Sequence, residues 1–165
     1  MKQIPVHATH EFPAVYDNSA EILILGSFPS VKSREVRFYY GHPQNRFWKL
    51  LASLYGAPLP DTTEEKIRFL HDHHIALWDV LAECTVRGSG DASIHDEIPN
   101  DLSRILEHAP IRHIYLNGNT AYRYFLKYQS SSVKVPYTKL PSTSPANARM
   151  RFDGLRKEWL ALLTP

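Results

Sequence analysis

Four short segments of the chain carry residues that could bind a polar ligand or take part in a reaction. They are residues 26–29 (GSFP), 84–91, 116–119 (LNGN) and 140–146 (LPSTSPA). Backbone amides and hydroxyl groups just before a helix are suited to holding a phosphate group, which fits the Ser-Thr-Ser of the last segment. A side-chain amide such as that of Asn117 offers both a hydrogen-bond donor and an acceptor. These residue types indicate recognition of a polar ligand by hydrogen bonds.

Two carboxylates, Asp79 and Glu83, lie at and just after the end of a predicted strand and could form a general-base pair. An Asp at a strand end also commonly fixes a loop by hydrogen bonds, so both interpretations stay open. Residues 71–74 (HDHH) suggest a metal site, but a histidine cluster at a helix end with no further ligand set is more often solvated. We therefore expect no metal and no cofactor.

The elements that must position these segments follow from hydrophobic pattern and turn residues. The strands are predicted at residues 22–27, 75–80, 111–116 and 133–137. Helices are predicted from Pro43 to Gly56, from Thr62 to about His73, from near Pro99, from Thr120 to Tyr128, and from Ser144 onward. Thr62 and Glu65 form a capping-box pattern. Pro136 cannot donate to a strand ladder, which predicts that the last strand lies at a sheet edge.

Strands that alternate with helices predict a parallel sheet covered by helices on both faces. The expected fold is therefore α/β, one three-layer α/β/α domain over residues 1–165, with residues 1–20 as an irregular amino-terminal arm. The four segments all follow strands, so they should meet at the carboxyl edge of the sheet, where open α/β folds bind ligands.

Composition excludes some functions and leaves others open. The formal net charge of +2 is too small to indicate nucleic-acid binding by itself. The one cysteine, Cys84, excludes an internal disulfide and favours a reducing compartment. No export signal or membrane-spanning run is evident, so we expect a cytoplasmic protein without a membrane partner. The absence of a Gly-Lys-Ser/Thr phosphate loop argues against a nucleotide hydrolase.

Several motifs, in this order along the chain, resemble the uracil-DNA glycosylase superfamily and most closely its hypoxanthine-DNA (deoxyinosine) glycosylase branch. They are GSFPS, FYYGHPQNRFW, LWDV, LNGNTA and LPSTSPANA, between Ile22 and about Arg149. The resemblance implies a four-stranded parallel sheet of order 2-1-3-4. It also implies a monofunctional DNA glycosylase of base excision repair, which cleaves the N-glycosidic bond of a base rotated out of the stack. The expected partner is DNA containing deaminated bases, with hypoxanthine favoured over uracil or xanthine.

The resemblance also assigns roles to individual residues. Phe28 stands where many members of the superfamily have a catalytic Asp or Asn, and the branch's catalytic asparagine maps onto Asn45. A neutral amide is a weak base, so Asn45 would act by positioning water and by electrostatics. The substrate-binding residues expected are Gly26, Ser27, Phe28, Tyr40, His42 and Asn117, and the DNA-binding residues Ser142, Thr143, Ser144 and Arg149.

A second interpretation stays open. Asn45 could simply cap a helix, Asn117-Gly118 could simply form a turn, and the serines of the last segment could simply cap the final helix. The chain would then be a non-catalytic module that binds nucleic acid or a nucleotide with a glycosylase-like fold. In either case we expect a monomer.

Overall fold

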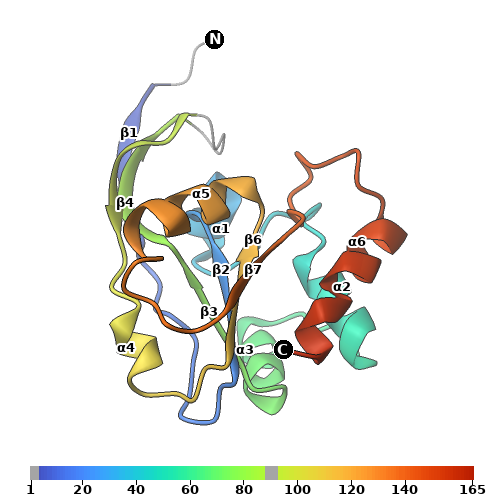
Figure 1. The fold of residues 1–165 in the computed structure, drawn as a ribbon. Helices are drawn as coiled ribbons and strands as arrows, with labels where there is room; N and C mark the ends of the chain where they lie inside the picture. Colours follow the sequence, from blue (N-terminus) through green and yellow to red (C-terminus); the bar gives the residue numbers. More distant parts are fainter. Residues whose placement is uncertain (1–3, 88–92) are drawn as a thin grey trace.

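A four-stranded parallel sheet forms the centre of the computed structural model, which describes residues 4–87 and 93–165 (Figure 1). Its strands are β2 (Ile22–Gly26), β3 (Ile75–Asp79), β6 (His113–Asn117) and β7 (Tyr137–Leu140), in the order β3-β2-β6-β7. Numbered along the chain, this is the predicted order 2-1-3-4. β2 and β3 are buried along their whole length, which explains their uninterrupted apolar sequence.

Helices cover both faces of this sheet and complete the three layers (Figure 1). α2 (Phe47–Tyr55) and α6 (Phe152–Trp159) lie together on one side, and α4 (Ser103–Leu106) and α5 (Asn119–Tyr128) lie on the other. α3 (Thr63–Asp72) packs beside β3 and begins at the predicted capping box, in which the Thr62 hydroxyl accepts from the Glu65 amide. A short 3₁₀ helix, η2 (Leu160–Leu163), follows α6. Apolar side chains fill the space between the layers, for example Phe47 against Trp159.

A second, antiparallel sheet was not predicted. It contains β1 (Val6–Thr9), β4 (Leu81–Val86) and β5 (His95–Pro99), in the order β1-β4-β5. The prediction of an irregular arm over residues 1–20 is therefore wrong for Val6–Thr9, and that of a loop over residues 84–91 is wrong for residues 84–86. Ala8, Cys84 and Val86 are buried, and this apolar contact between distant segments stabilises the pairing. Residues 88–91 of that predicted loop lie outside the described residues.

Several predicted boundaries are also corrected. The helix expected at Pro43 begins at Phe47, and the one expected at Ser144 begins at Phe152, because hydrogen-bonded turns occupy the residues between. α1 (Val31–Val36) was not predicted. β7 starts after Pro136, whose carbonyl oxygen accepts a hydrogen bond from the amide of Ile114. β7 pairs only with β6 in this sheet, so the predicted edge position is confirmed.

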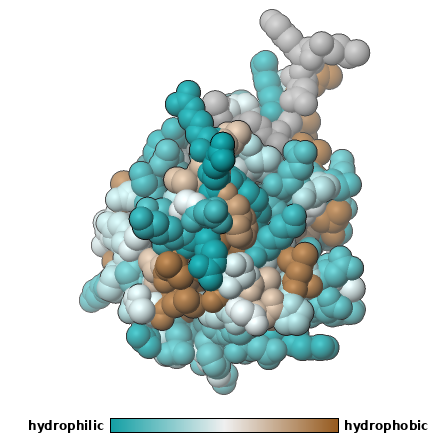
Figure 2. Space-filling view, turned by 90° about the vertical axis from the view of Figure 1, so that its right-hand side faces the viewer, coloured by the Kyte–Doolittle hydropathy of each residue, from teal (hydrophilic) through white to brown (hydrophobic). Residues whose placement is uncertain are grey.

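The face that carries α2 and α6 is mostly hydrophilic, and its hydrophobic areas are separated from one another (Figure 2). Scattered apolar side chains of this kind are normal on a protein surface. Within the part of the chain that the structure describes, no helix has the length and apolar character needed to cross a membrane.

Candidate active site

Three neighbouring strands of the parallel sheet end at one cavity. Gly26, the last residue of β2, pairs in register with Asp79 of β3, and Leu25 pairs with Leu116, which places Asn117 of β6 on the other side of Gly26. The cavity has a volume of about 210 Å³, which is the liquid volume of about seven water molecules. It lies at the carboxyl edge of the sheet, where three of the four predicted segments meet, whereas the described residues 84–87 of the fourth segment are not part of its lining.

Most of the predicted site residues line this cavity. They are Gly26, Ser27, Phe28, Tyr40, Asn45, Asn117, Ser142, Thr143 and Ser144. His42 and Arg149 are not part of its lining: the His42 ring accepts a hydrogen bond from the amide of Gln44, and Arg149 is exposed beyond the cavity. Asn45, Phe28 and the segment before the last helix therefore share one site, although 98 positions separate Asn45 from Thr143 in the sequence.

The glycine at position 26 leaves room for two oxygen atoms at the floor of the cavity. A Cβ atom on Gly26 would lie 2.5 Å from Oδ1 of Asp79 and 3.0 Å from the hydroxyl oxygen of Tyr40. Real Cβ atoms do not approach other atoms this closely. A larger residue at position 26 would therefore displace the carboxylate or the hydroxyl group from the floor.

Tyr40 is held in an unusual conformation at this floor. Its φ angle of 54° is uncommon for a residue other than glycine, and its ring stacks on Phe47 with the ring centres 4.0 Å apart. Burial raises the pKa of Tyr40, and the charge of Asp79 raises it further, so the hydroxyl group keeps its proton. The hydroxyl oxygen is buried and has no hydrogen-bond partner of standard geometry within the described residues, although the Asn117 amide is near enough to offset part of the rise in pKa. It is therefore a donor available to a ligand.

The amide of Asn117 holds the segment of residues 141–150, which we call the site loop. Its nitrogen donates to the Thr143 hydroxyl and its oxygen accepts from the Thr143 amide, both at 3.0 Å. Thr143 is completely buried. A side-chain amide has a second N–H and a second lone pair, so Asn117 keeps hydrogen-bonding capacity for a ligand. Gly118 allows Ser142 to lie close, since a Cβ there would lie 3.0 Å from the Cβ of Ser142.

Asn45 lies in a turn directly before α2, where its amide donates to the carbonyl of His42. Its side-chain oxygen accepts from the amide of Phe47 at 3.0 Å, so Asn45 does stabilise the start of the helix. The same half-buried side chain lines the cavity. The helix-capping role and a role in the cavity are therefore compatible.

Arg46 is a site residue that the sequence analysis missed. Its guanidinium donates to the carbonyl oxygens of Ser144 at 3.2 Å, Asn147 at 3.1 Å and Met150. Its backbone amide donates to the carbonyl of Thr143 at 3.1 Å. Arg46 thus ties the turn that contains Asn45 to the site loop. The sequence offered only a weak signal, a long donor side chain next to Asn45.

Phe28 presents its ring to the cavity from the loop after β2. The guanidinium carbon of Arg34 lies 5.8 Å from the centre of this ring, at cation–π distance. The Phe28 side chain is half-buried, and the ring of His10 meets it edge-on at 6.3 Å. A planar ligand in the cavity could therefore contact an aromatic ring that already has fixed neighbours.

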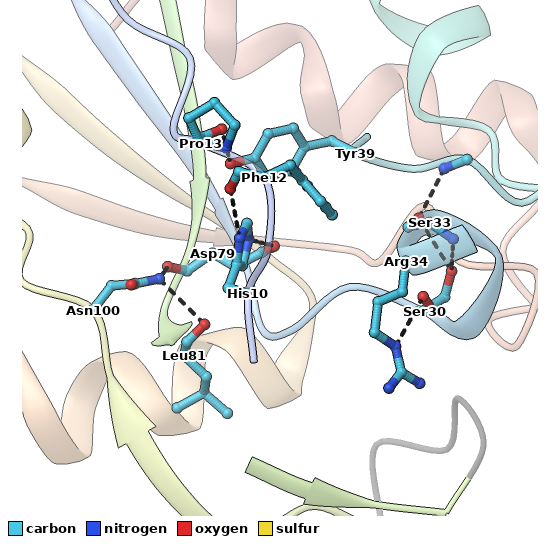
Figure 3. A network of polar contacts seen from close by, with 11 residues as sticks. His10, Phe12, Pro13, Ser30, Ser33, Arg34, Tyr39, Asp79, Leu81 and Asn100 are labelled. Carbon is cyan, nitrogen blue, oxygen red and sulfur yellow. Dashed lines mark hydrogen bonds and ion pairs between the residues drawn. The ribbon is translucent and has the colours of Figure 1, made fainter. Parts of the chain in front are cut away.

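The second residue that the sequence analysis missed is His10. Its Nε2 lies 2.8 Å from Oδ2 of Asp79, and both side chains are about 95% buried (Figure 3). The Nδ1 atom of the same ring lies 2.8 Å from the carbonyl oxygen of Phe12. The backbone carbonyl of Asp79 accepts from the side-chain amide of Asn100. Asp79 is therefore fixed by contacts from two other segments.

A general-base pair of Asp79 and Glu83, one of the two interpretations that the sequence left open, does not form. Glu83 does not line the cavity; it lies on β4 and pairs with His7 of β1 at the surface, 3.0 Å apart. One residue, Val80, separates β3 from β4, and the chain turns there from one sheet into the other. This change of direction separates the two carboxylates.

Comparisons with known proteins agree on a family. A family model described as the uracil DNA glycosylase superfamily matches residues 13–163. A protein of Methanosarcina acetivorans named hypoxanthine DNA glycosylase is 41% identical over 155 residues, which cover 92% of this chain and 95% of the relative. A protein of the same name from Methanosarcina barkeri is 37% identical over 142 residues, 84% of this chain and 87% of the relative.

A solved structure is similar as well. It is a solution NMR structure of a Methanosarcina acetivorans protein described as a candidate uracil DNA glycosylase. Its TM-score is 0.78 at 38% sequence identity, and the match covers 92% of this chain and 93% of the other. The likeness therefore extends over nearly the whole of both chains.

Proposed function

The chain belongs to the uracil-DNA glycosylase superfamily, and from this premise we propose that it removes hypoxanthine from DNA by hydrolysing the N-glycosidic bond. Its relatives that are named hypoxanthine DNA glycosylase support a DNA glycosylase activity. The observation that carries the proposal is that Asn45, Phe28 and Asn117 line one cavity at the carboxyl edge of the sheet. We further propose that the protein acts as a cytoplasmic monomer on DNA containing deaminated bases.

The cavity suits a base that has been rotated out of the DNA stack. Enzymes that act on a base in DNA extrude it into a closely fitting pocket and hold it by stacking and by hydrogen bonds. Phe28 supplies the aromatic ring, and such stacking contributes roughly 1–3 kcal/mol per base. The remaining N–H of the Asn117 amide can donate to an acceptor on the base edge. These contacts would orient the glycosidic bond toward Asn45.

Asn45 is the proposed catalytic residue. Its amide would hold a water molecule against C1′ of the sugar and direct its oxygen dipole at the positive charge that develops there. The hydrogen bond to the amide of Phe47 fixes the side chain, so positioning needs little reorganisation. The departing base gains negative charge, which the backbone amides at Ser27 and Phe28 would stabilise. The scheme uses no cofactor and no metal.

The site loop is the proposed contact with the DNA backbone. Ser142 and Ser144 lie on it, and their hydroxyl groups accept from the amides of Ser144 and Ala146. These hydroxyl groups and the nearby exposed Arg149 would contact phosphate oxygens. Affinity for DNA should then fall as the salt concentration rises.

Release of free hypoxanthine from an inosine-containing oligonucleotide, measured in a single turnover, tests the proposal. Asn45→Ala should reduce release at least a hundred-fold, as the removal of a positioned electrostatic group does, and leave DNA binding nearly unchanged. No release by the wild-type protein would favour the alternative, a binding module without catalysis. Full activity of Asn45→Ala would instead move the chemistry to another group of the cavity, with Asp79 the next candidate.

A further inference from the structure

The segment from residue 108 to residue 152 contains no acidic residue. It carries seven lysine or arginine residues, whereas all 17 aspartate and glutamate residues of the chain lie outside it. The small net charge of +2 therefore results from an uneven distribution of charge along the chain. Positive charge that gathers in one part of a protein is typical of a surface that binds nucleic acid.

The fold places this segment at one edge of the parallel sheet. The segment forms β6, α5, the outer strand β7 and the site loop (Figure 1). α5 packs against β7, and the side chains of Tyr137 and Lys139 lie on the side of β7 that faces α5, where both contact the ring of Tyr122. We call the area formed by Tyr122, Arg123, Tyr137 and Lys139 the α5–β7 surface.

The α5–β7 surface adjoins the site loop, although none of its four residues lines the cavity. Lys139 lies two positions before the first residue of the loop, Pro141. At the start of α5, the amide of Tyr122 donates to the carbonyl of Gly118, and Gly118 lies against Ser142 of the loop. A phosphate backbone that contacts the site loop can therefore continue directly onto this surface.

Two cations of this surface have no acidic partner. Arg123 and Lys139 are exposed, and within residues 4–87 and 93–165 neither lies at ion-pair distance from a carboxylate. Lys127, one turn further along α5, differs because it already pairs with Glu97 at 2.8 Å. The charges of Arg123 and Lys139 are therefore available to an anion outside the chain.

Aromatic rings hold both cations in place. The guanidinium carbon of Arg123 lies 5.0 Å from the centre of the Tyr124 ring, and Nζ of Lys139 lies 5.7 Å from the centre of the Tyr122 ring. A cation–π contact attracts the cation without neutralising its charge. A side chain that is already held in this way loses less freedom when it binds a ligand. The surface therefore presents two charges that are positioned in advance.

We propose that the α5–β7 surface binds the phosphate backbone of the DNA on one side of the damaged nucleotide, with Arg123 and Lys139 as the phosphate-binding residues. The charge alone would also suit an acidic protein. DNA is favoured because the surface continues from the site loop beside the cavity, and this step rests on the proposed function. A strand that delivers a base to the cavity must continue beyond the site loop. The α5–β7 surface would extend the contact in that direction.

The test measures how the affinity for unmodified DNA depends on salt, with single-stranded and duplex oligonucleotides of equal length. Each phosphate contact contributes about 0.9 to the slope of log affinity against log salt on duplex DNA and about 0.7 on a single strand. The double variant Arg123→Met/Lys139→Met should therefore reduce the slope by about 1.8 or about 1.4. The ratio of wild-type to variant affinity should then fall about ten-fold between about 50 and 200 mM salt.

The two forms of DNA distinguish the source of the phosphates. A reduced slope on either form supports the inference and identifies the form whose backbone reaches the surface. Unchanged slopes on both forms overturn it.

Lys66→Met is the matched control. Nζ of Lys66 also lies over an aromatic ring, at 5.4 Å from the centre of the Trp48 ring. It belongs to α3, which has two glutamates in its first turn and lies away from the site loop (Figure 1). This variant should keep the wild-type slope. The exchange Arg123→Lys/Lys139→Arg should keep it as well, because both charges remain. A reduced slope in the exchanged variant would attribute the effect to altered packing and overturn the inference.

A second experiment locates the surface relative to the damaged base. Inosine-containing oligonucleotides are lengthened on one flank at a time, and release of hypoxanthine is measured at limiting protein. The α5–β7 surface lies on one side of the cavity, beyond β6, so the double variant should lose the gain in rate from lengthening one flank and keep the gain from the other. Equal losses on both flanks would contradict this position. If the wild-type protein releases no hypoxanthine, the proposed function fails, while the salt dependence on unmodified DNA still decides the inference.

Discussion

Replacing Arg46 by methionine would release the site loop from α2 while nearly keeping the side-chain volume. In the native chain one guanidinium donates to the carbonyl oxygens of Ser144, Asn147 and Met150. The backbone hydrogen bond from Arg46 to Thr143 is unaffected by the substitution. The experiment therefore isolates the contribution of the side chain.

The expected loss follows from the three hydrogen bonds. A hydrogen bond to a charged group contributes roughly 1.5–3 kcal/mol, but the freed carbonyl groups of a surface loop can bind water instead. We therefore expect the free energy of unfolding to fall by about 2–3 kcal/mol in total, well below the sum of three separate bonds. In a chain of this size, this corresponds to a decrease in Tm of roughly 4–12 °C.

Thermal unfolding and single-turnover release of hypoxanthine measure the two consequences. The freed loop should weaken DNA binding more than it slows release at saturating protein. Arg112→Met is the control, since Arg112 forms an exposed ion pair with Glu21 at 3.3 Å, and such pairs contribute about 0–1 kcal/mol. Equal Tm values for the two variants, together with unchanged DNA binding by Arg46→Met, would show that Arg46 does not hold the loop.

Three further predictions concern the cavity, acid stability and the DNA contact. Gly26→Ala should reduce excision at least ten-fold, because the new Cβ would meet the carboxylate of Asp79 at 2.5 Å; stability should change less, and wild-type excision rates would contradict the described floor. The hydrogen bond from the Lys127 ammonium group lowers the pKa of Glu97 to about 2. The pair therefore stabilises the fold at pH values above the ordinary pKa of a glutamate, and this stabilisation is lost as the pH falls toward 2. Urea unfolding of Glu97→Gln between pH 6 and pH 3 should show a weaker dependence on pH than the wild-type protein. Arg149→Ala should weaken DNA binding and reduce the slope of log affinity against log salt by about 1, and an unchanged slope would remove Arg149 from the contact.

The parallel sheet was predictable because its signals are local. Ile22–Gly26 and Ile75–Asp79 are short apolar runs that end in turn residues, and the Thr62–Glu65 capping box lies within one helical turn. Phe28 could be placed at the site because it follows a predicted strand, whereas Asn45 was assigned to the same site from the resemblance to the glycosylase superfamily. Because the strands are parallel neighbours, the segments that follow them lie at the same edge of the sheet.

The missed features depend on contacts between distant parts of the chain. His10 meets Asp79 across 69 positions, and Arg46 meets the carbonyl groups of the site loop across about 100. The acceptors of Arg46 are backbone atoms, which carry no sequence signature. Pro43 suggested a helix start, but the chain makes a turn until Phe47, since the side chain of Asn45 caps α2 from outside it. Contacts that the sequence pattern does not reveal therefore determine where His10 and Arg46 lie and where α2 begins.

The amino-terminal segment has a consequence for shortened versions of the protein. Its strand β1 belongs to the outer, antiparallel sheet (Figure 1), but its residue 10 contacts the buried carboxylate of Asp79. A version that begins at residue 11 would leave this buried carboxylate without its histidine partner. Removal of these residues should therefore destabilise the folded protein, although they lie at the very start of the described chain.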